Sequence, residues 1–191
     1  MILFFVTLGG QPVSFRRPSW FLCSFNLPIA NIRNTSDLSR IGLDKNKSEE
    51  LAVKLNDLLA NYTVFYQNVR GFHWNVKGEK FFELHIKFEE LYNDLFMKID
   101  EVAERILTLG YAPEHRYSNY MGSSEIKESS EVQDGRACVQ QVLDSFKTLL
   151  VKQRTILDLS GEIDDEGTNA QMSDYIREQE KLIWMYSAYL A

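Results

Sequence analysis

The sequence is poor in cysteine and proline. Its 191 residues contain two cysteines, Cys23 and Cys138, which lie far apart and in no metal-binding spacing. This usage argues against a disulfide framework and suits a reducing cytosol, so we expect a cytoplasmic protein. None of the four prolines falls between residues 81 and 109, so a helix can run through that stretch without interruption.

The sequence also lacks a long apolar run and a basic body. No run of about 20 apolar residues exists, which predicts no transmembrane helix and no membrane partner. The net charge is −6 and the pI is about 5.2. Residues 1–47 contain six basic and two acidic residues, a net charge of +4, so residues 48–191 carry −10. Such a body repels phosphate, and we expect weak or absent DNA binding.

Residues 1–47 differ in composition from the rest of the chain. MILFFVTLGG resembles the apolar part of a signal peptide, but it is short and no basic residue precedes it. The following residues mix polar, proline and aromatic types without a period. We interpret 1–47 as a disordered or loosely docked extension, or as translated upstream sequence. A basic arm for nucleic acid or membrane is the weaker alternative, because its positive charges are few.

Residues 48–191 are expected to form one domain of four long helices. The first begins near Ser48, an N-cap residue type, and continues to about His73. The second spans Phe81 to Leu109, the third about 134–159, and the fourth follows a turn at 160–168. Residues 111–132 form a long connection that holds a short helix. Short, long and short connections predict an all-α, ferritin-like four-helix bundle with one crossover.

Residues 72–109 contain two of the three histidines and a set of acids at helical spacing. At 100° per residue, His85, Glu89, Asp100 and Glu104 lie within an arc of about 100°. His85 with Glu89 and Asp100 with Glu104 are i,i+4 pairs, and each pair can converge on one ion. His73 continues the inward stripe of the preceding helix. The five residues are therefore candidate metal ligands.

The two pairs are too far apart to share a metal within one helix. His85 and Asp100 are separated by about 22 Å at 1.5 Å per residue, whereas metal–ligand bonds are about 2 Å long. Two antiparallel copies related by a twofold axis would bring His85 and Glu89 of one copy to Asp100 and Glu104 of the other. The spacing thus predicts a site between subunits, if there is one metal site.

Each candidate also has a structural interpretation. A histidine on an apolar face is often only buried, and Lys98 or Arg105 can form salt bridges with nearby acids. Mixed imidazole and carboxylate ligands suit iron or zinc rather than calcium. The chain has no Glu-x-x-His motif, which argues against a metal pair inside one bundle. Trp74 is either core packing, which we favour, or an electron donor.

The stretch FHWNVKGEKFFELHIKFEELYNDLFMKIDEVAERILTLG resembles the signature of the Dps family, the ferritin-like DNA-binding proteins from starved cells. DDEGTN and EKLIWMYSAYL resemble the last turn and last helix of that family. The resemblance implies a ferroxidase in a homododecameric shell, which oxidises Fe(II) with hydrogen peroxide or oxygen and stores the ferric mineral. It also implies that His73, His85 and Glu89 come from one subunit, and Asp100 and Glu104 from its twofold mate.

Some features depart from the family pattern. Glu89 stands where many members have aspartate, and Gly161 and Ala170 occupy positions that are often acidic near the iron-entry pore. Asp164, Asp165 and Glu166 are the acids available there. No lysine-rich tail follows the last helix. Two rival functions stay open: a nucleoid-coating protein with a vestigial metal site, and a metal buffer without turnover.

Overall fold

The computed structural model describes residues 37–191, which form five helices. The helices are α1 (Lys45–Asn75), α2 (Phe81–Thr108), α3 (Tyr117–Ser123), α4 (Gly135–Glu162) and α5 (Glu166–Leu190). The expected all-α bundle, with a short helix in the long connection, is confirmed. None of the described helices is long and apolar enough to cross a membrane. Most of the N-terminal extension, residues 1–36, lies outside the described residues.

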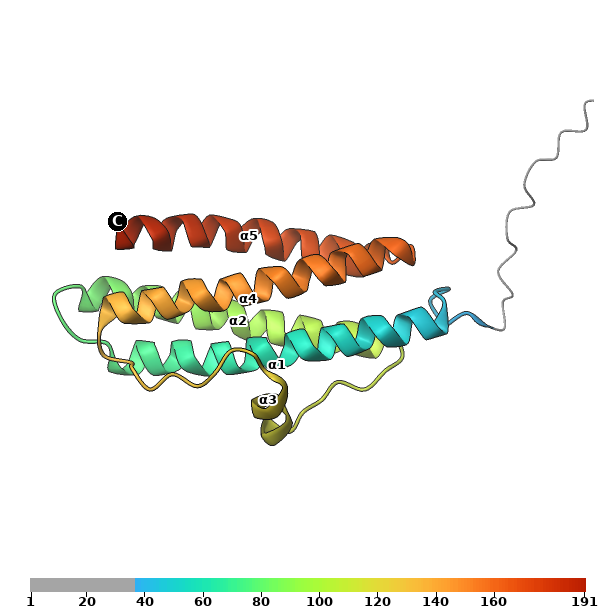
Figure 1. Cartoon of the computed structure of the whole chain (residues 1–191), viewed down its shortest axis with the longest axis horizontal. Helices are drawn as coiled ribbons and strands as arrows, with labels where there is room; N and C mark the ends of the chain where they lie inside the picture. Colours follow the sequence, from blue (N-terminus) through green and yellow to red (C-terminus); the bar gives the residue numbers. More distant parts are fainter. Residues whose placement is uncertain (1–36) are drawn as a thin grey trace, which may run out of the picture. The chain divides into compact units, whose positions relative to one another are not determined.

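The four long helices form two antiparallel hairpins. Figure 1 shows α1 beside α2 in one layer and α4 beside α5 in the other, with α1 and α4 in contact between the layers. Gly78 in the α1–α2 turn and Gly110 after α2 have φ values of 106° and 96°, which glycine adopts without steric cost. The crossover that contains α3 runs along the outside of α1 (Figure 1).

The first helix begins earlier than the sequence pattern indicates. Asp44, not Ser48, is its N-cap, and the Asp44 side chain accepts a hydrogen bond of 3.1 Å from the backbone N–H of Lys47. The Ser48 hydroxyl instead donates to the Asp44 carbonyl at 2.7 Å. Both residues are typical N-caps, so the sequence alone cannot choose between them.

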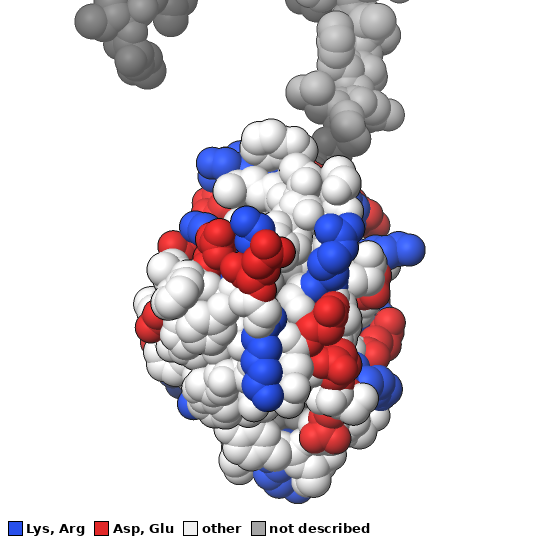
Figure 2. Space-filling view, turned by 90° about the vertical axis from the view of Figure 1, so that its left-hand side faces the viewer, with Lys and Arg blue, Asp and Glu red and all other residues white. Residues whose placement is uncertain are grey.

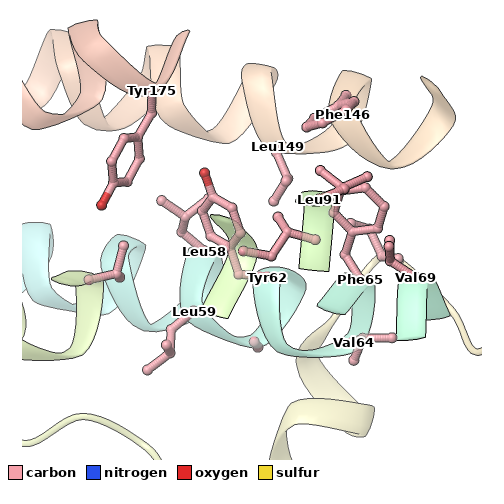
Figure 3. Close-up of a cluster of buried hydrophobic side chains, with 14 of the residues drawn as sticks. Leu58, Leu59, Tyr62, Val64, Phe65, Val69, Leu91, Phe146, Leu149 and Tyr175 are labelled. Atoms are coloured by element: carbon pink, nitrogen blue, oxygen red, sulfur yellow. The ribbon is translucent and has the colours of Figure 1, made fainter. Parts of the chain in front are cut away.

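The core fills the space between the two hairpins. In α1 and α4, the residues that recur at the helical period in the sequence are all buried: Leu51, Leu55, Leu58, Tyr62, Phe65, Val69, Phe72, Cys138, Val142, Phe146, Leu149, Gln153 and Ile156. Figure 3 shows several of these side chains meeting between the layers. Phe65 and Phe146 pack edge to face with ring centroids 5.3 Å apart. Close packing of this kind holds α1 rigidly, and α1 carries His73.

Asparagine side chains of α1 bind the crossover to the bundle. The Asn61 side-chain oxygen accepts backbone hydrogen bonds from Glu125 at 3.0 Å and Ile126 at 3.1 Å. About two helical turns further along α1, the Asn68 side-chain oxygen accepts a hydrogen bond from the Ser129 backbone N–H at 3.0 Å. A loop that has no secondary-structure partners thus has its backbone N–H groups satisfied by one face of α1.

Candidate metal site

His73 and His85 hold each other in place next to the turn that joins α1 to α2. The Nδ1–H of each ring donates to the backbone carbonyl of the other residue, and both distances are 2.8 Å. The rings are stacked, with centroids 3.8 Å apart and planes 17° from parallel. Because a carbonyl oxygen only accepts, Nδ1 carries the proton, and the Nε2 atom of both residues keeps a free lone pair.

The helix α2 has two apolar faces rather than one. Its buried face consists of Leu84, Phe88, Leu91, Leu95, Val102 and Ile106. The apolar residues that recur at the helical period in this stretch also include Phe82 and Phe96, but these two lie outside the core: Phe82 is 77% exposed and Phe96 57% exposed. Ile86, Met97 and Leu107 are also exposed. Helical periodicity in the sequence identifies apolar stripes along α2, but it cannot show which of two apolar stripes faces the core.

The three candidate carboxylates lie on this outer face. Glu89, Asp100 and Glu104 are all exposed in the single chain. Within residues 37–191 none of the three forms an ion pair. The salt-bridge interpretation therefore does not account for them, because Arg105 pairs with Asp165 instead.

The structure brings the two histidines together but does not complete a metal site. Among residues 37–191, no group of three or more His, Cys, Asp or Glu side chains could hold a metal ion. Glu89 lies one turn along α2 from His85, whereas Asp100 and Glu104 lie in the second half of the helix. Whether these five residues bind metal together stays a prediction.

Tyr92 borders His73, and Arg70 lies over the ring of the neighbouring Trp74; the sequence interpretation assigned neither to the site. Tyr92 packs edge-on against His73 with ring centroids 5.3 Å apart. The Arg70 guanidinium lies 4.7 Å from the centroid of the Trp74 ring. Trp74 is 57% exposed, so its assignment to the core is wrong within one chain. The sequence offered one indication for Arg70: it precedes His73 by three residues, and residues at i,i+3 are neighbours on a helix surface.

Charged side chains also connect α2 to α5. Arg105 donates to Asp165 at 2.5 Å and to the Thr168 hydroxyl at 2.8 Å. Burial raises the pKa of Asp165, but the bonds from Arg105 and Thr168 outweigh it and hold that pKa below its usual value. Asp165 also caps α5. This acid is thus used inside its own subunit, while Asp164 and Glu166 are the exposed acids of the turn.

The centre of the bundle holds a neutral polar cluster. The Nε2 atoms of Gln153 and Gln179 donate to the Tyr62 hydroxyl at 2.7 Å and 2.5 Å, and Gln153 also donates to the Gln179 oxygen at 3.1 Å. All three residues are fully buried. Burial raises the pKa of Tyr62 far above its usual value, so the phenol stays protonated. This cluster contains none of the carboxylates that bind metal in diiron bundles.

Comparison with known proteins first defines the class. Residues 52–191 match the family model of the ferritin-like domain. The DNA protection during starvation protein of Porphyromonas gingivalis is 44% identical over 148 residues, which cover 78% of this chain and 93% of the relative.

Solved structures agree with this match. The Dps protein of Vibrio cholerae O1, described as a ferritin-like diiron-carboxylate protein, is 57% identical, with a TM-score of 0.80 over 83% of this chain and 99% of that one. Dps from Bacillus brevis is 35% identical, with a TM-score of 0.74 over 76% and 98% of the chains. The chain therefore belongs to the Dps family of ferritin-like proteins, and this membership implies iron binding in general terms.

Proposed function

We propose that the protein is a ferroxidase and iron-storage protein of the cytoplasm. It oxidises Fe(II) with hydrogen peroxide, or with oxygen as the second oxidant, at sites shared between two subunits. The ferric product is stored inside a shell of twelve copies, which protects the cell from oxidative damage. Membership of the Dps family supports this proposal, and one observation on α2 carries it.

That observation is the spacing of His85, Glu89, Asp100 and Glu104 along α2, which allows an antiparallel pairing of α2 with a second copy of itself. When Glu89 is placed opposite Asp100 of the second copy, His85 falls opposite Glu104 without further adjustment. A twofold axis then creates the same arrangement twice. Each site receives imidazole groups from one copy and carboxylates from both.

The same register also matches the exposed apolar residues. Phe82, which is 77% exposed, falls opposite Leu107, which is 59% exposed. Ile86, which is 52% exposed, falls opposite Ala103. Exposed apolar patches of this kind mark interaction surfaces, and their burial would stabilise the pair of helices that also completes the site.

The donor set suits the proposed chemistry. Two imidazole nitrogens and three carboxylates are ligands that bind iron in either oxidation state, and the anionic carboxylates favour the ferric product. Two Fe(II) ions each give one electron to one hydrogen peroxide, which takes up two protons and becomes two water molecules. Because the electrons are delivered as a pair, no hydroxyl radical is released.

We infer that DNA binding at physiological salt is weak. Figure 2 shows one end of the bundle, where Lys and Arg side chains are interspersed with Asp and Glu. The charge of −10 on residues 48–191 opposes contact with phosphates, and the attraction of the few basic groups falls further as salt rises. A gel shift showing tight binding at physiological salt would contradict this inference.

The test is anaerobic Fe(II) loading followed by addition of hydrogen peroxide, with ferric absorbance recorded over time. His73→Ala combined with His85→Ala should abolish fast oxidation and leave the assembly, read by light scattering, unchanged. His115→Ala is the matched control, because the His115 side chain is 86% exposed and lies in the crossover. An unchanged oxidation rate in the double variant would refute the assigned site.

The rival functions give different results in the same experiment. An intact wild-type assembly that binds Fe(II) in stoichiometric amounts without consuming peroxide would be a metal buffer. An assembly that compacts DNA without oxidising iron would be a nucleoid-coating protein.

A further inference from the structure

Arg70 differs from the other basic residues that are withdrawn from solvent. Within residues 37–191, four Lys or Arg residues are buried or half-buried: Arg70, Lys98, Arg105 and Lys152. Each of the last three has a carboxylate oxygen within 2.6 Å of a side-chain nitrogen. Arg70 has no carboxylate partner among the described residues. A half-buried charge without a counter-ion costs free energy, so binding of an anion from another molecule would stabilise the Arg70 guanidinium.

The surroundings of Arg70 are aromatic and open to one side. Its guanidinium lies 5.3 Å from the centroid of Tyr66 and 4.7 Å from that of Trp74. Cation–π contacts of this kind stabilise the charge but leave the N–H donors of the guanidinium free. Tyr66 also contacts Phe96, which is exposed on the outer face of α2, with centroids 6.3 Å apart. Arg70 therefore borders the face on which a second copy would pack.

The contacts between α1 and α2 fix the level of Arg70 along the hairpin. His73 lies against His85, and Tyr66 lies against Tyr92, with centroids 6.2 Å apart. Because α1 and α2 are antiparallel, each step back along α1 from His73 corresponds to one step forward along α2 from His85. Arg70 therefore lies at the level of residues 88 and 89 of α2. In the antiparallel register proposed above, residue 89 lies opposite Asp100 of the second copy.

We propose that Arg70 is a positioning residue that forms an ion pair with Asp100 of a second copy of the chain. This inference rests on the proposed function and names a residue that the shared site needs beyond its ligands. Glu89 of the same chain lies at the same level, yet no ion pair joins it to Arg70. The carboxylate that arrives with the second copy is therefore the counter-ion.

The pair has a direct consequence for the metal site. The planar guanidinium donates two parallel hydrogen bonds to a carboxylate and thereby fixes its plane. A carboxylate has about four lone-pair positions, so Asp100 can accept from Arg70 and still offer a lone pair to a metal. Partners that orient ligands in this way typically change metal affinity by about 10–100-fold.

The test is a double-substitution cycle read by Co²⁺ titration of the assembled protein, followed by visible absorption. Arg70→Gln should weaken Co²⁺ binding at least tenfold, and Arg70→Lys, which keeps the charge but not the planar fork, should give an intermediate loss. Because the pair is already broken in Asp100→Asn, adding Arg70→Gln to that variant should have little further effect. Arg154→Gln is the matched control, since Arg154 pairs with Glu180 between α4 and α5. Light scattering in the same samples separates loss of affinity from loss of assembly.

Each outcome decides the proposal. Non-additive losses with an intact assembly support the ion pair. Additive losses, or an unchanged affinity in Arg70→Gln, overturn it while leaving the proposed site in place. Binding of inorganic phosphate that needs Arg70 but not Asp100 also overturns it, by assigning the guanidinium to a free oxyanion. A wild-type protein that binds no Co²⁺ refutes the proposed metal site itself.

Discussion

The bundle centre and the outer face of α2 treat polar side chains in opposite ways. At the centre, Tyr62, Gln153 and Gln179 are fully buried, uncharged and hydrogen-bonded mainly to one another. On the outer face, Asp100 and Glu104 are charged, exposed and without ion pairs among the described residues. Both regions lie in a bundle of the kind that binds iron, yet of the two only the outer face of α2 contains carboxylates.

The difference follows from the cost of burying charge. A charged group in the core must be neutralised by a partner of opposite sign or by a metal. The centre of this bundle avoids that cost with amides and a phenol, so it is stable without metal. The outer face of the single chain keeps its carboxylates in water, and in the proposed function a second copy and a metal would cover them. On that proposal, folding of the single chain and assembly of the site are separate events.

The largest expected effect comes from placing a charge at the centre. Gln153→Glu should lower the free energy of unfolding by about 3–5 kcal/mol at pH 7, because the carboxylate would be fully buried. Burial raises the folded pKa of this carboxyl above its unfolded value, so the penalty should disappear below the unfolded pKa of about 4.3. Urea unfolding at pH 7 and pH 4 measures both effects. Equal stability of the variant and wild type at pH 7 would show that the centre tolerates charge.

A smaller effect is expected where charge is buried with its partner. Asp165→Asn should cost about 2 kcal/mol, because Arg105 loses its counter-ion while asparagine still caps α5. The folded pKa of Asp165 is below its unfolded value, so this carboxylate adds stability above the unfolded pKa and loses it as pH falls through the folded pKa. Thermal melts from pH 7 to pH 2 should therefore show the two proteins converging in acid. A difference independent of pH would contradict the ion-pair explanation.

The smallest effect on stability is expected on the outer face. Glu89→Gln should change the free energy of unfolding of the chain by no more than about 0.5 kcal/mol, since Glu89 is exposed and unpaired. The same change should weaken Co²⁺ binding at least tenfold, or about 1.4 kcal/mol, because it removes a proposed ligand. Melting curves and Co²⁺ titration of one preparation test both parts. Unaltered Co²⁺ affinity would remove Glu89 from the site.

Much of the fold was predictable because its signals are local. The apolar stripe of α1 recurs at the helical period, and every predicted member of it is buried. The start of α1 was predicted at Ser48 but lies after Asp44, since two good N-caps stood four residues apart. The crossover has no periodic pattern, and nothing in the sequence shows that Asn61 and Asn68 bind its backbone.

The candidate site was predictable only in part. Spacing along one helix identified His85, Glu89, Asp100 and Glu104 as candidates, because the regular rise and rotation of a helix fix the relative positions of its residues. The sequence interpretation also favoured core packing for Trp74, although Trp74 is 57% exposed. Helical periodicity shows which residues share a face of the helix, but it does not show whether that face packs against the core or is exposed to solvent.

By itself, the sequence determined the helices, their order, the single long crossover and the residues on the α2 face, since all of these follow from local periodicity and breakers. The tertiary structure alone decided that His73 and His85 fix each other's ring orientation through backbone carbonyls. It also decided that Glu89, Asp100 and Glu104 are exposed in the single chain and that Arg70 has no counter-ion within residues 37–191. The physical reason is that hydrogen bonds and burial depend on which elements pack together, and residues distant in sequence make those contacts.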